Sequence, residues 1–141
     1  MMLYKQGRFW VEGASFQIPE GFYIETDPDV NYERGLAAWD PTRTHLYLWA
    51  ISEEEEEGTK EALEEMTKEL KTLSPPAPIT LNGLPGHWMT YGGKTFQNYE
   101  ARFALNDEEQ LVFIVEGGDN DISKIMESPE FRSALEGIRA D

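Results

Sequence analysis

Two histidines, His45 and His87, are the side chains of this 141-residue chain best suited to proton transfer near neutral pH. A hydrolase or an isomerase could use either histidine together with a carboxylate. No Gly-x-Ser-x-Gly motif and no cysteine accompany them, so nothing local supplies a nucleophile. The same counts exclude cysteine and multi-histidine metal sites. We therefore expect no enzymatic activity and no cofactor.

Two short loops carry residue types that bind phosphate or calcium. Residues 92–95, Gly-Gly-Lys-Thr, lack the upstream glycine of a phosphate-binding loop, so a hairpin turn is the better interpretation. Residues 119–121, Asp-Asn-Asp, offer oxygen ligands, but Ser123 stands where a calcium loop needs another Asp or Asn. We expect Asp119 or Asp121 to cap the helix that follows, and we expect no metal site.

The net charge narrows the choice of partner. The chain has 27 acidic residues against 12 lysines and arginines, a formal net charge of −15. This charge repels nucleic acid and anionic membrane surfaces, so we expect neither as a partner. The apolar runs are too short to insert into a membrane. The first residues lack the apolar stretch of a signal peptide, which predicts a soluble, cytoplasmic protein.

The acidic residues gather in two regions, 53–71 and 106–141, whereas residues 72–105 contain one acid, Glu100. The run of glutamates at residues 53–57 could dock a basic protein. Acidic side chains at a helix start also interact with the positive end of the helix dipole, and a solvated helix start is the simpler interpretation. If the two acidic regions meet in space, they would attract a basic protein partner.

Aromatic residues, 12% of the chain, supply the candidate contact residues. The expected strands at residues 45–51 and 87–91 are apolar on both faces, which favours a core covered by helices on both sides. The alternative is a binding surface or pocket, because Tyr and Trp have polar tips suited to ligand contact. The candidate partner- or ligand-binding residues are Tyr47, Trp49, Trp88 and Tyr91.

The elements that position these residues begin with hairpins. We expect strands at residues 9–11, 16–18, 22–24, 36–39 and 45–51, with a type I turn at residues 40–43. A helix follows, because Leu63, Met66, Leu70 and Leu73 have helical spacing. Thr59 is its expected N-cap, and Ser-Pro-Pro at residues 74–76 is expected to end it.

Strands return after this helix, at residues 79–81, 87–91, 95–105 and 111–115. On the long strand Glu100 and Arg102 share a side, which we expect to be partly solvated. The chain ends in helices, the last with Ser128 as N-cap and Pro129 as its first residue. Short turns make successive strands antiparallel. The prediction is one α+β domain over residues 1–141, with an antiparallel sheet of about seven strands and helices packed on it.

Two turn motifs and the order of elements carry a resemblance to a known family. Ile-Pro-Glu-Gly-Phe at residues 18–22 follows an early hairpin, and Asn-Gly-Leu-Pro-Gly at residues 82–86 opens a meander. With the acidic helix between them and the Ser-Pro-x-Phe helix at residues 128–131, the chain resembles the PsbP-like superfamily. This group includes the PsbP subunit of photosystem II, an import factor that binds the Ran GTPase, and small bacterial proteins.

The resemblance implies an α/β/α sandwich, with helices on both faces of an antiparallel sheet, and a binding or assembly role without enzymatic activity. We therefore expect a small bacterial protein that binds another protein, a basic one if the acidic regions meet. The alternative is a carrier of a small or lipid-like molecule, with an apolar pocket between sheet and helix lined by Met66, Met89 and aromatic residues.

Overall fold

The computed structural model describes residues 3–5, 8–11, 13–18, 22–24, 35–39 and 47–140. The first elements are β1 (Leu3–Lys5), β2 (Arg8–Val11), β3 (Ala14–Gln17), β4 (Tyr23–Ile24), β5 (Gly35–Trp39) and β6 (Tyr47–Glu54). They are followed by α1 (Thr59–Met66), β7 (Lys71–Leu81), β8 (Leu84–Gly92), β9 (Gln97–Ala104), β10 (Glu109–Glu116), α2 (Ile122–Met126), α3 (Pro129–Glu136) and β11 (Arg139–Ala140). His45 and the turn predicted at residues 40–43 lie outside the described residues.

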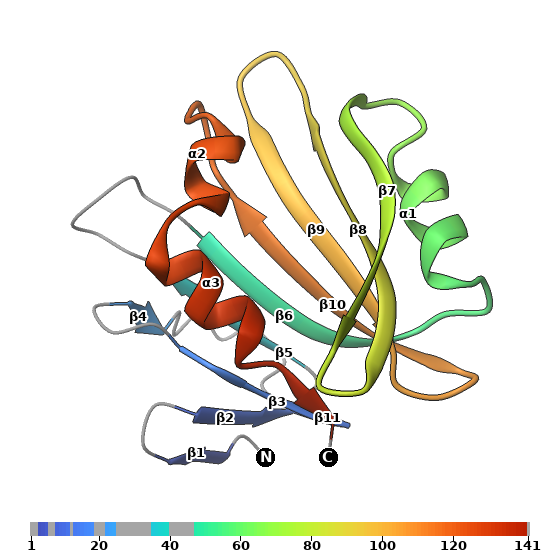
Figure 1. Cartoon of the computed structure of the whole chain (residues 1–141), viewed down its shortest axis with the longest axis vertical. Helices are drawn as coiled ribbons and strands as arrows, with labels where there is room; N and C mark the ends of the chain where they lie inside the picture. The colour runs from blue at the N-terminus through green and yellow to red at the C-terminus, as the bar shows by residue number, and fades with distance from the viewer. Residues whose placement is uncertain are drawn as a thin grey trace.

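The strands form two antiparallel sheets (Figure 1). The larger sheet has the order β4-β5-β6-β10-β9-β8-β7, and the smaller one has the order β1-β2-β3-β11. Five long strands, β6 to β10, form the body of the larger sheet, which the short β4 and β5 extend on one side. The α+β class with an antiparallel sheet is thus confirmed. The hairpin of β2 and β3 matches the strands expected at residues 9–11 and 16–18, but its separation into a second sheet with β1 and β11 was not expected.

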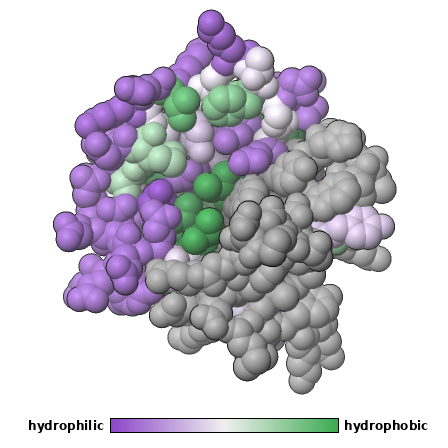
Figure 2. Space-filling model, turned by 180° about the vertical axis from the view of Figure 1, so that it is seen from behind, coloured by the Kyte–Doolittle hydropathy of each residue, from purple (hydrophilic) through white to green (hydrophobic). Residues whose placement is uncertain are grey.

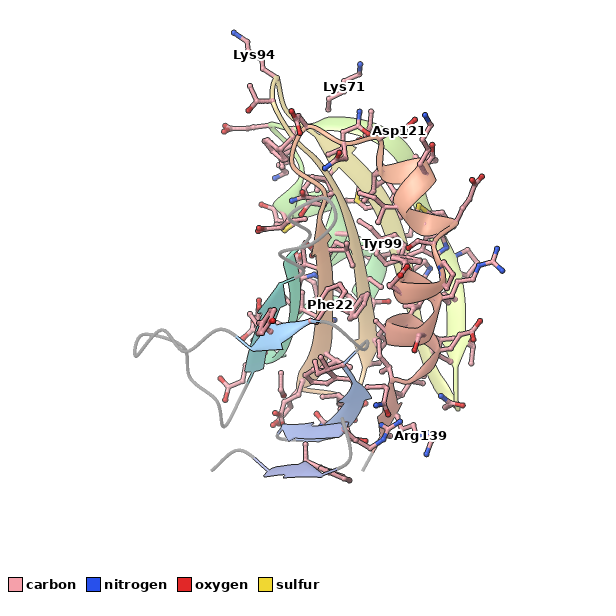
Figure 3. All side chains as sticks on the ribbon, turned by 90° about the vertical axis from the view of Figure 1, so that its left-hand side faces the viewer. Phe22, Lys71, Lys94, Tyr99, Asp121 and Arg139 are labelled. Carbon is pink, nitrogen blue, oxygen red and sulfur yellow. The ribbon has the colours of Figure 1, made fainter. Side chains whose placement is uncertain are left out.

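Helices pack on both faces of the larger sheet. Tyr99 of β9 belongs to a core that includes residues of α2 and α3, and its ring lies edge-on to that of Phe131, with centroids 4.8 Å apart. On the opposite face, Met89 of β8 is buried against Leu63 of α1. The sheet is therefore the middle layer, with α1 on one side and α2 and α3 on the other (Figure 1, Figure 3).

The structure corrects the prediction for α1 and for the segment after it. Gly58, not Thr59, is the N-cap residue, and the helix ends at Met66, so Leu73 lies outside it. The segment Lys71–Leu81 is strand β7, although it contains three prolines. Proline has no backbone N–H, and β7 is an edge strand with a neighbour on one side only. An edge strand tolerates prolines at positions whose N–H would face away from that neighbour, because no ladder hydrogen bond is lost there.

The turn between β7 and β8 is tighter than expected. Asn82 and Gly83 form it alone, with left-handed φ angles of 49° and 84°, as in the type I′ turn that an Asn-Gly pair favours. The Asn82 side chain also donates to the backbone oxygen of Ile138 at 2.7 Å, which ties this hairpin to the end of the chain. Leu84, expected in the loop, is the first residue of β8.

The caps predicted for the C-terminal helices are confirmed. The Ser128 hydroxyl accepts a hydrogen bond from the backbone N–H of Phe131 at 3.2 Å, and Pro129 is the first residue of α3. The Asp121 carboxylate caps α2 by accepting the N–H of Ser123 at 3.0 Å. α2 and α3 cover one face of the larger sheet. The opposite face is covered by α1 and bordered by the chain that leads into α1.

Candidate functional site

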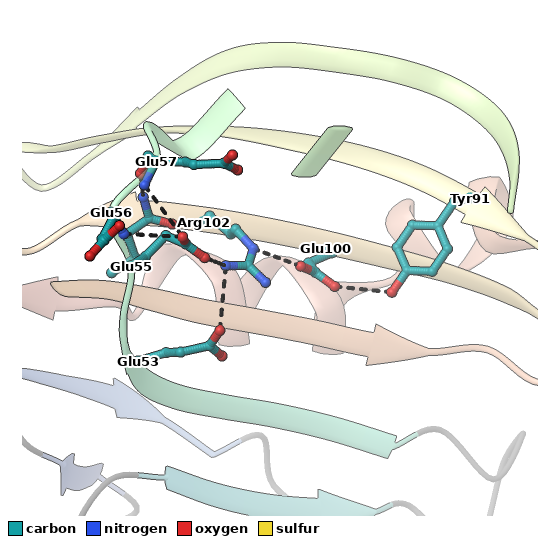
Figure 4. A network of polar contacts seen from close by, with 8 residues as sticks. Glu53, Glu55, Glu56, Glu57, Tyr91, Glu100 and Arg102 are labelled. Carbon is teal, nitrogen blue, oxygen red and sulfur yellow. Dashed lines mark hydrogen bonds and ion pairs between the residues drawn. The ribbon is translucent and has the colours of Figure 1, made fainter. Parts of the chain in front are cut away.

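A buried charged pair lies on the α1 face of the larger sheet. Glu100 and Arg102 stand two positions apart on β9, so both side chains emerge on the same face. Arg102 Nε donates to Glu100 Oε2 at 2.9 Å, and the Tyr91 hydroxyl donates to Glu100 Oε1 at 3.0 Å (Figure 4). Glu100 is 0% exposed and Arg102 is 5% exposed. The expectation of a partly solvated side is therefore wrong for these two residues, because α1 packs over this part of β9, whereas Asn98 on the same side is half-buried.

Three carboxylates face the guanidinium of Arg102. Besides Glu100, Glu53 and Glu55 place carboxylate oxygens 3.8 and 3.6 Å from Arg102 Nη1. Burial raises the pKa of Glu100, and the charge of Arg102 opposes this rise. Burial and the charge of Glu100 also raise the pKa of the Tyr91 hydroxyl, which keeps it a hydrogen-bond donor. With its three carboxylates ionised, the group carries more negative than positive charge.

Residues 55–58, which we call the strap, join β6 to α1 beside Arg102 (Figure 4). The Glu55 carboxylate accepts hydrogen bonds from the backbone N–H groups of the next two residues, at 3.1 and 3.3 Å. The backbone N–H of Glu55 donates to the Glu108 carbonyl at 2.9 Å, and Gln110 Nε2 donates to a strap carbonyl at 2.7 Å. Glu55 therefore shapes the strap and also faces Arg102.

The strap borders a surface hollow of about 950 Å³, which we call the acidic hollow. Ala62 and Met66 of α1 supply its apolar lining, and Arg102 is the basic residue among the described residues that line it. Its acidic residues come from β6, the strap, α1 and the β9–β10 turn, and are Glu53, Glu54, Glu55, Glu56, Glu57, Glu65, Asp107 and Glu108. Figure 2 shows hydrophilic residues gathered along the α1 side of the molecule.

A second hollow, of about 420 Å³, also has the strap as a wall, and we call it the His87 pocket. The ends of β7 and β8 and the β9–β10 turn supply the rest of its lining. His87 Nδ1 lies 2.8 Å from the hydroxyl oxygen of Thr59, at the start of α1. The described hydrogen-bond partner of His87 is thus a hydroxyl group, whereas the hydrolase hypothesis needs a carboxylate.

The aromatic residues Trp88 and Tyr91 lie on opposite faces of the larger sheet. Trp88 packs on the α2 and α3 side, where its ring stacks on that of Tyr99 with centroids 5.5 Å apart. Tyr91 is buried on the α1 side with Leu63. Because the two residues are three positions apart on one strand, the structure does not bring them into one patch. Their role as contact residues stays a prediction.

The other two aromatic candidates, Tyr47 and Trp49, belong to β6. The register of β6 and β10 places Tyr47 opposite Glu116 and Trp49 opposite Ile114. A contact role for these two positions also stays a prediction. The strand β6 runs from them directly into the glutamates of the acidic hollow.

The two methionines expected to line a carrier pocket lie in different surroundings. Met89 is 1% exposed and packs with Leu63 between α1 and the sheet. Met66 is 39% exposed and lines the acidic hollow. The space between helix and sheet at Met89 is thus filled by side chains of the chain itself.

No group of three or more His, Asp or Glu among the described residues is placed to hold a metal ion. The Asp-Asn-Asp segment at residues 119–121 serves the start of α2 instead, where Asp121 caps the helix and the Asn120 side chain donates to the Gly117 carbonyl at 2.8 Å. The described helices are all too short or too polar to cross a bilayer.

The buried pair on β9 is the feature that the sequence prediction missed. A signal for it was present, because Glu100 is the single acid in residues 72–105 and stands two positions before Arg102 on the same strand. Opposite charges on one face of a buried strand favour an ion pair over two solvated side chains. The strap could not be expected from a local pattern, since it depends on contacts with β10.

Comparison with solved structures confirms the PsbP-like fold predicted from the sequence. The solution structure of cyanobacterial PsbP (CyanoP) from Synechocystis sp. PCC 6803 matches with a TM-score of 0.62, over 95% of this chain and 91% of that chain, at 9% identity. A crystal structure from Bacteroides thetaiotaomicron VPI-5482 matches with a TM-score of 0.60 at 8% identity, over 97% of this chain, which spans 49% of that one. No protein-family model and no curated protein matches this chain. The likeness is one of fold.

Proposed function

We propose that this protein is a non-enzymatic binding module that receives a basic segment of another protein in the acidic hollow. The observation that carries the proposal is the lining of this hollow, in which eight acidic residues stand beside one arginine. One guanidinium balances one carboxylate, and Arg102 is already hydrogen-bonded to Glu100 behind it. Lysine and arginine side chains of a partner would supply the missing positive charge.

The arrangement of the acidic residues favours a chain segment as the partner. They come from β6, the strap, α1 and the β9–β10 turn, so they surround the hollow rather than form one stripe. The exposed Met66 adds an apolar contact for the stem of a long basic side chain. The shared fold with cyanobacterial PsbP is compatible with the binding role that the sequence resemblance implies. A fold does not determine a partner, so the choice of a basic segment rests on the residues of the hollow.

The test compares two triple variants with the same change in net charge. E54Q/E56Q/E108Q removes three exposed carboxylates of the hollow, and D119N/E127Q/E136Q removes three exposed carboxylates elsewhere. The probe is a fluorescein-labelled decapeptide of alternating Lys and Ala, and fluorescence anisotropy measures its dissociation constant at about 50 and about 500 mM salt.

We expect the hollow variant to bind the peptide at least about tenfold more weakly than the wild type, and the control variant to bind within about twofold of it. Binding by the wild type should weaken at the higher salt concentration, because salt screens the exposed charges. Equal losses in both triple variants would mean that net charge alone attracts the peptide. That result would refute the hollow as the site.

A further inference from the structure

Arg102 is a cation that the chain itself places at the acidic hollow. Its Nη1 lies 3.8 Å from a carboxylate oxygen of Glu53 and 3.6 Å from one of Glu55, and both glutamates line the hollow. These distances are longer than a hydrogen bond, and Nη1 has no hydrogen-bond partner among the described residues. A small advance of the guanidinium would turn both contacts into charge-assisted hydrogen bonds. Arg102 can therefore compete with the cations of a partner for these two carboxylates.

Glu100 holds the guanidinium back from them. Arg102 Nε donates to Glu100 Oε2 at 2.9 Å, the length of a charge-assisted hydrogen bond. The Tyr91 hydroxyl fixes Glu100 from the other side by donating to its Oε1 at 3.0 Å. Figure 4 shows Glu100 between Tyr91 and Arg102, with Glu55 beyond the guanidinium. The tight contact of Arg102 thus points away from the strap, and its loose contacts point towards it.

The carboxylates around Arg102 differ in what a partner can reach. Glu100 is 0% exposed, whereas the side chains of Glu53 and Glu55 are 44% and 25% exposed. A basic segment can therefore contact Glu53 and Glu55 but cannot touch Glu100. Because the buried carboxylate compensates the charge of Arg102, the two accessible ones keep their negative charge for the partner. Without this compensation, the guanidinium would neutralise one of them.

We propose that Glu100 is a positioning residue, which keeps the acidic hollow available to cations by holding Arg102 away from its carboxylates. Glu100 acts through Arg102 and makes no contact with the partner. This inference rests on the proposed function, because it names the buried group that sets the affinity of that hollow. A purely structural role of the pair would stabilise the fold and leave the affinity of the folded protein unchanged.

The test is Glu100→Gln, which keeps the shape of the side chain and removes its charge. Burial raises the pKa of Glu100 by disfavouring the charged form, so the neutral side chain should be compatible with the fold. The probe is the same Lys-Ala decapeptide at about 50 mM salt. We expect E100Q to bind it about fivefold more weakly than the wild type, or weaker still. Unchanged binding would overturn the inference.

Three variants show whether the charge of Arg102 causes the loss. E100Q/R102Q removes both charges and restores the balance at the hollow. D119N removes one exposed carboxylate elsewhere and matches E100Q in net charge. Y91F removes the hydrogen bond to Glu100 and leaves both charges in place. We expect all three to bind within about twofold of the wild type. A double variant as weak as E100Q, or an equal loss in D119N or Y91F, would overturn the inference.

A second measurement uses the wild-type protein, so it does not depend on the folding of a variant. NMR spectra follow the Nε–H group of Arg102 under slightly alkaline conditions, before and after the decapeptide is added. A solvated arginine N–H exchanges with water and loses its signal there, whereas a buried and hydrogen-bonded one is protected. We expect the signal to persist in both states. Its absence in either state would mean that Glu100 does not hold Arg102, and the inference would be wrong.

The results separate this inference from the proposed function. If E54Q/E56Q/E108Q weakens peptide binding while E100Q binds like the wild type, the acidic hollow stands and the role of Glu100 is wrong. If both weaken binding and E100Q/R102Q restores it, both proposals are supported. If the triple variant of the hollow binds like the wild type, the proposed function fails, and the role of Glu100 fails with it whatever E100Q does.

Discussion

The buried pair on β9 predicts that the folded protein loses stability when the charge of Arg102 is removed. The substitution Arg102→Met keeps an unbranched side chain of similar length and removes the charge. It takes away the hydrogen bond of 2.9 Å to Glu100, which is 0% exposed, and the ion pair of 3.6 Å to Glu55 in the strap. The Tyr91 hydroxyl, 3.0 Å away, then remains as a hydrogen-bond donor to Glu100.

The expected loss of stability is large at alkaline pH. Removing one partner of a buried ion pair typically costs about 3–5 kcal/mol, because the other charge is left uncompensated. For a domain of this size each kcal/mol lowers Tm by roughly 3–5 °C, so R102M should melt about 10–20 °C below the wild type at pH about 8. The exposed Arg132 of α3 supplies the control, and R132M should change stability by less than about 0.5 kcal/mol.

The loss should shrink as the pH falls. Burial raises the pKa of Glu100 in the folded protein, so folding favours its protonated form. A raised carboxyl pKa contributes stability that is complete below the unfolded value and is lost as the pH rises through the folded value. Without Arg102 this pKa rises further, so Glu100 takes up a proton at a higher pH in R102M. The penalty of R102M should therefore be smaller at pH about 5 than at pH about 8.

Urea denaturation of four proteins tests this reasoning: the wild type, R102M, E100M and E100M/R102M. Replacing both members of a buried pair by apolar residues is often neutral or stabilising, so the double variant should be more stable than R102M alone. E100M should cost less than R102M, because Arg102 keeps Glu53 and Glu55 nearby. A double variant as unstable as the sum of the single ones, or a loss below about 1 kcal/mol for R102M at pH about 8, would refute the argument.

Three further substitutions test the local geometry, each by urea denaturation. Gly86→Ala places a methyl group against the backbone carbonyl of Arg102, and the two paired strands cannot easily move apart to make room. The substitution should lower the free energy of unfolding by about 1–3 kcal/mol. An unchanged stability would contradict the close approach of β8 and β9. Gly83→Ala has open space but a φ of 84°, so it should cost about 1–2 kcal/mol, and stability equal to the wild type would argue against the type I′ turn. Ser128→Ala removes the cap bond to Phe131 and should cost about 1 kcal/mol, whereas the exposed Ser133→Ala should cost nothing measurable.

Local signals in the sequence predict the parts of the fold whose energetics are local. Ser128 before Pro129 marks the start of α3. Alternating apolar and polar residues mark β9, and a short apolar run marks β10, because such signals act within a few residues. The helix prediction failed at Leu73 for the opposite reason. The spacing of the leucines is helical, but the segment Lys71–Leu81 pairs with β8, and that pairing of distant residues overrides the local pattern.

The candidate site depends almost wholly on such distant contacts. The run of glutamates at residues 53–57 is visible in the sequence, but its arrangement is set by a backbone hydrogen bond to Glu108 and by the side chain of Gln110. The two acidic regions do meet in space, since Asp107 and Glu108 line the same hollow as this run. The sequence analysis predicted a basic partner only if these two regions meet, and local spacing cannot show whether they do.

The strap gives the proposed binding in the acidic hollow a physical basis. The Glu55 carboxylate accepts the two strap N–H groups through Oε1, and its Oε2 faces Arg102 Nη1 at 3.6 Å, beyond hydrogen-bond distance. A cation bound in the acidic hollow would therefore compete with a loose contact rather than break a tight one. Gln110 also holds the strap, because its Nε2 donates to the Glu57 carbonyl at 2.7 Å. A basic segment can thus occupy the acidic hollow while the strap keeps the hydrogen bonds that shape it.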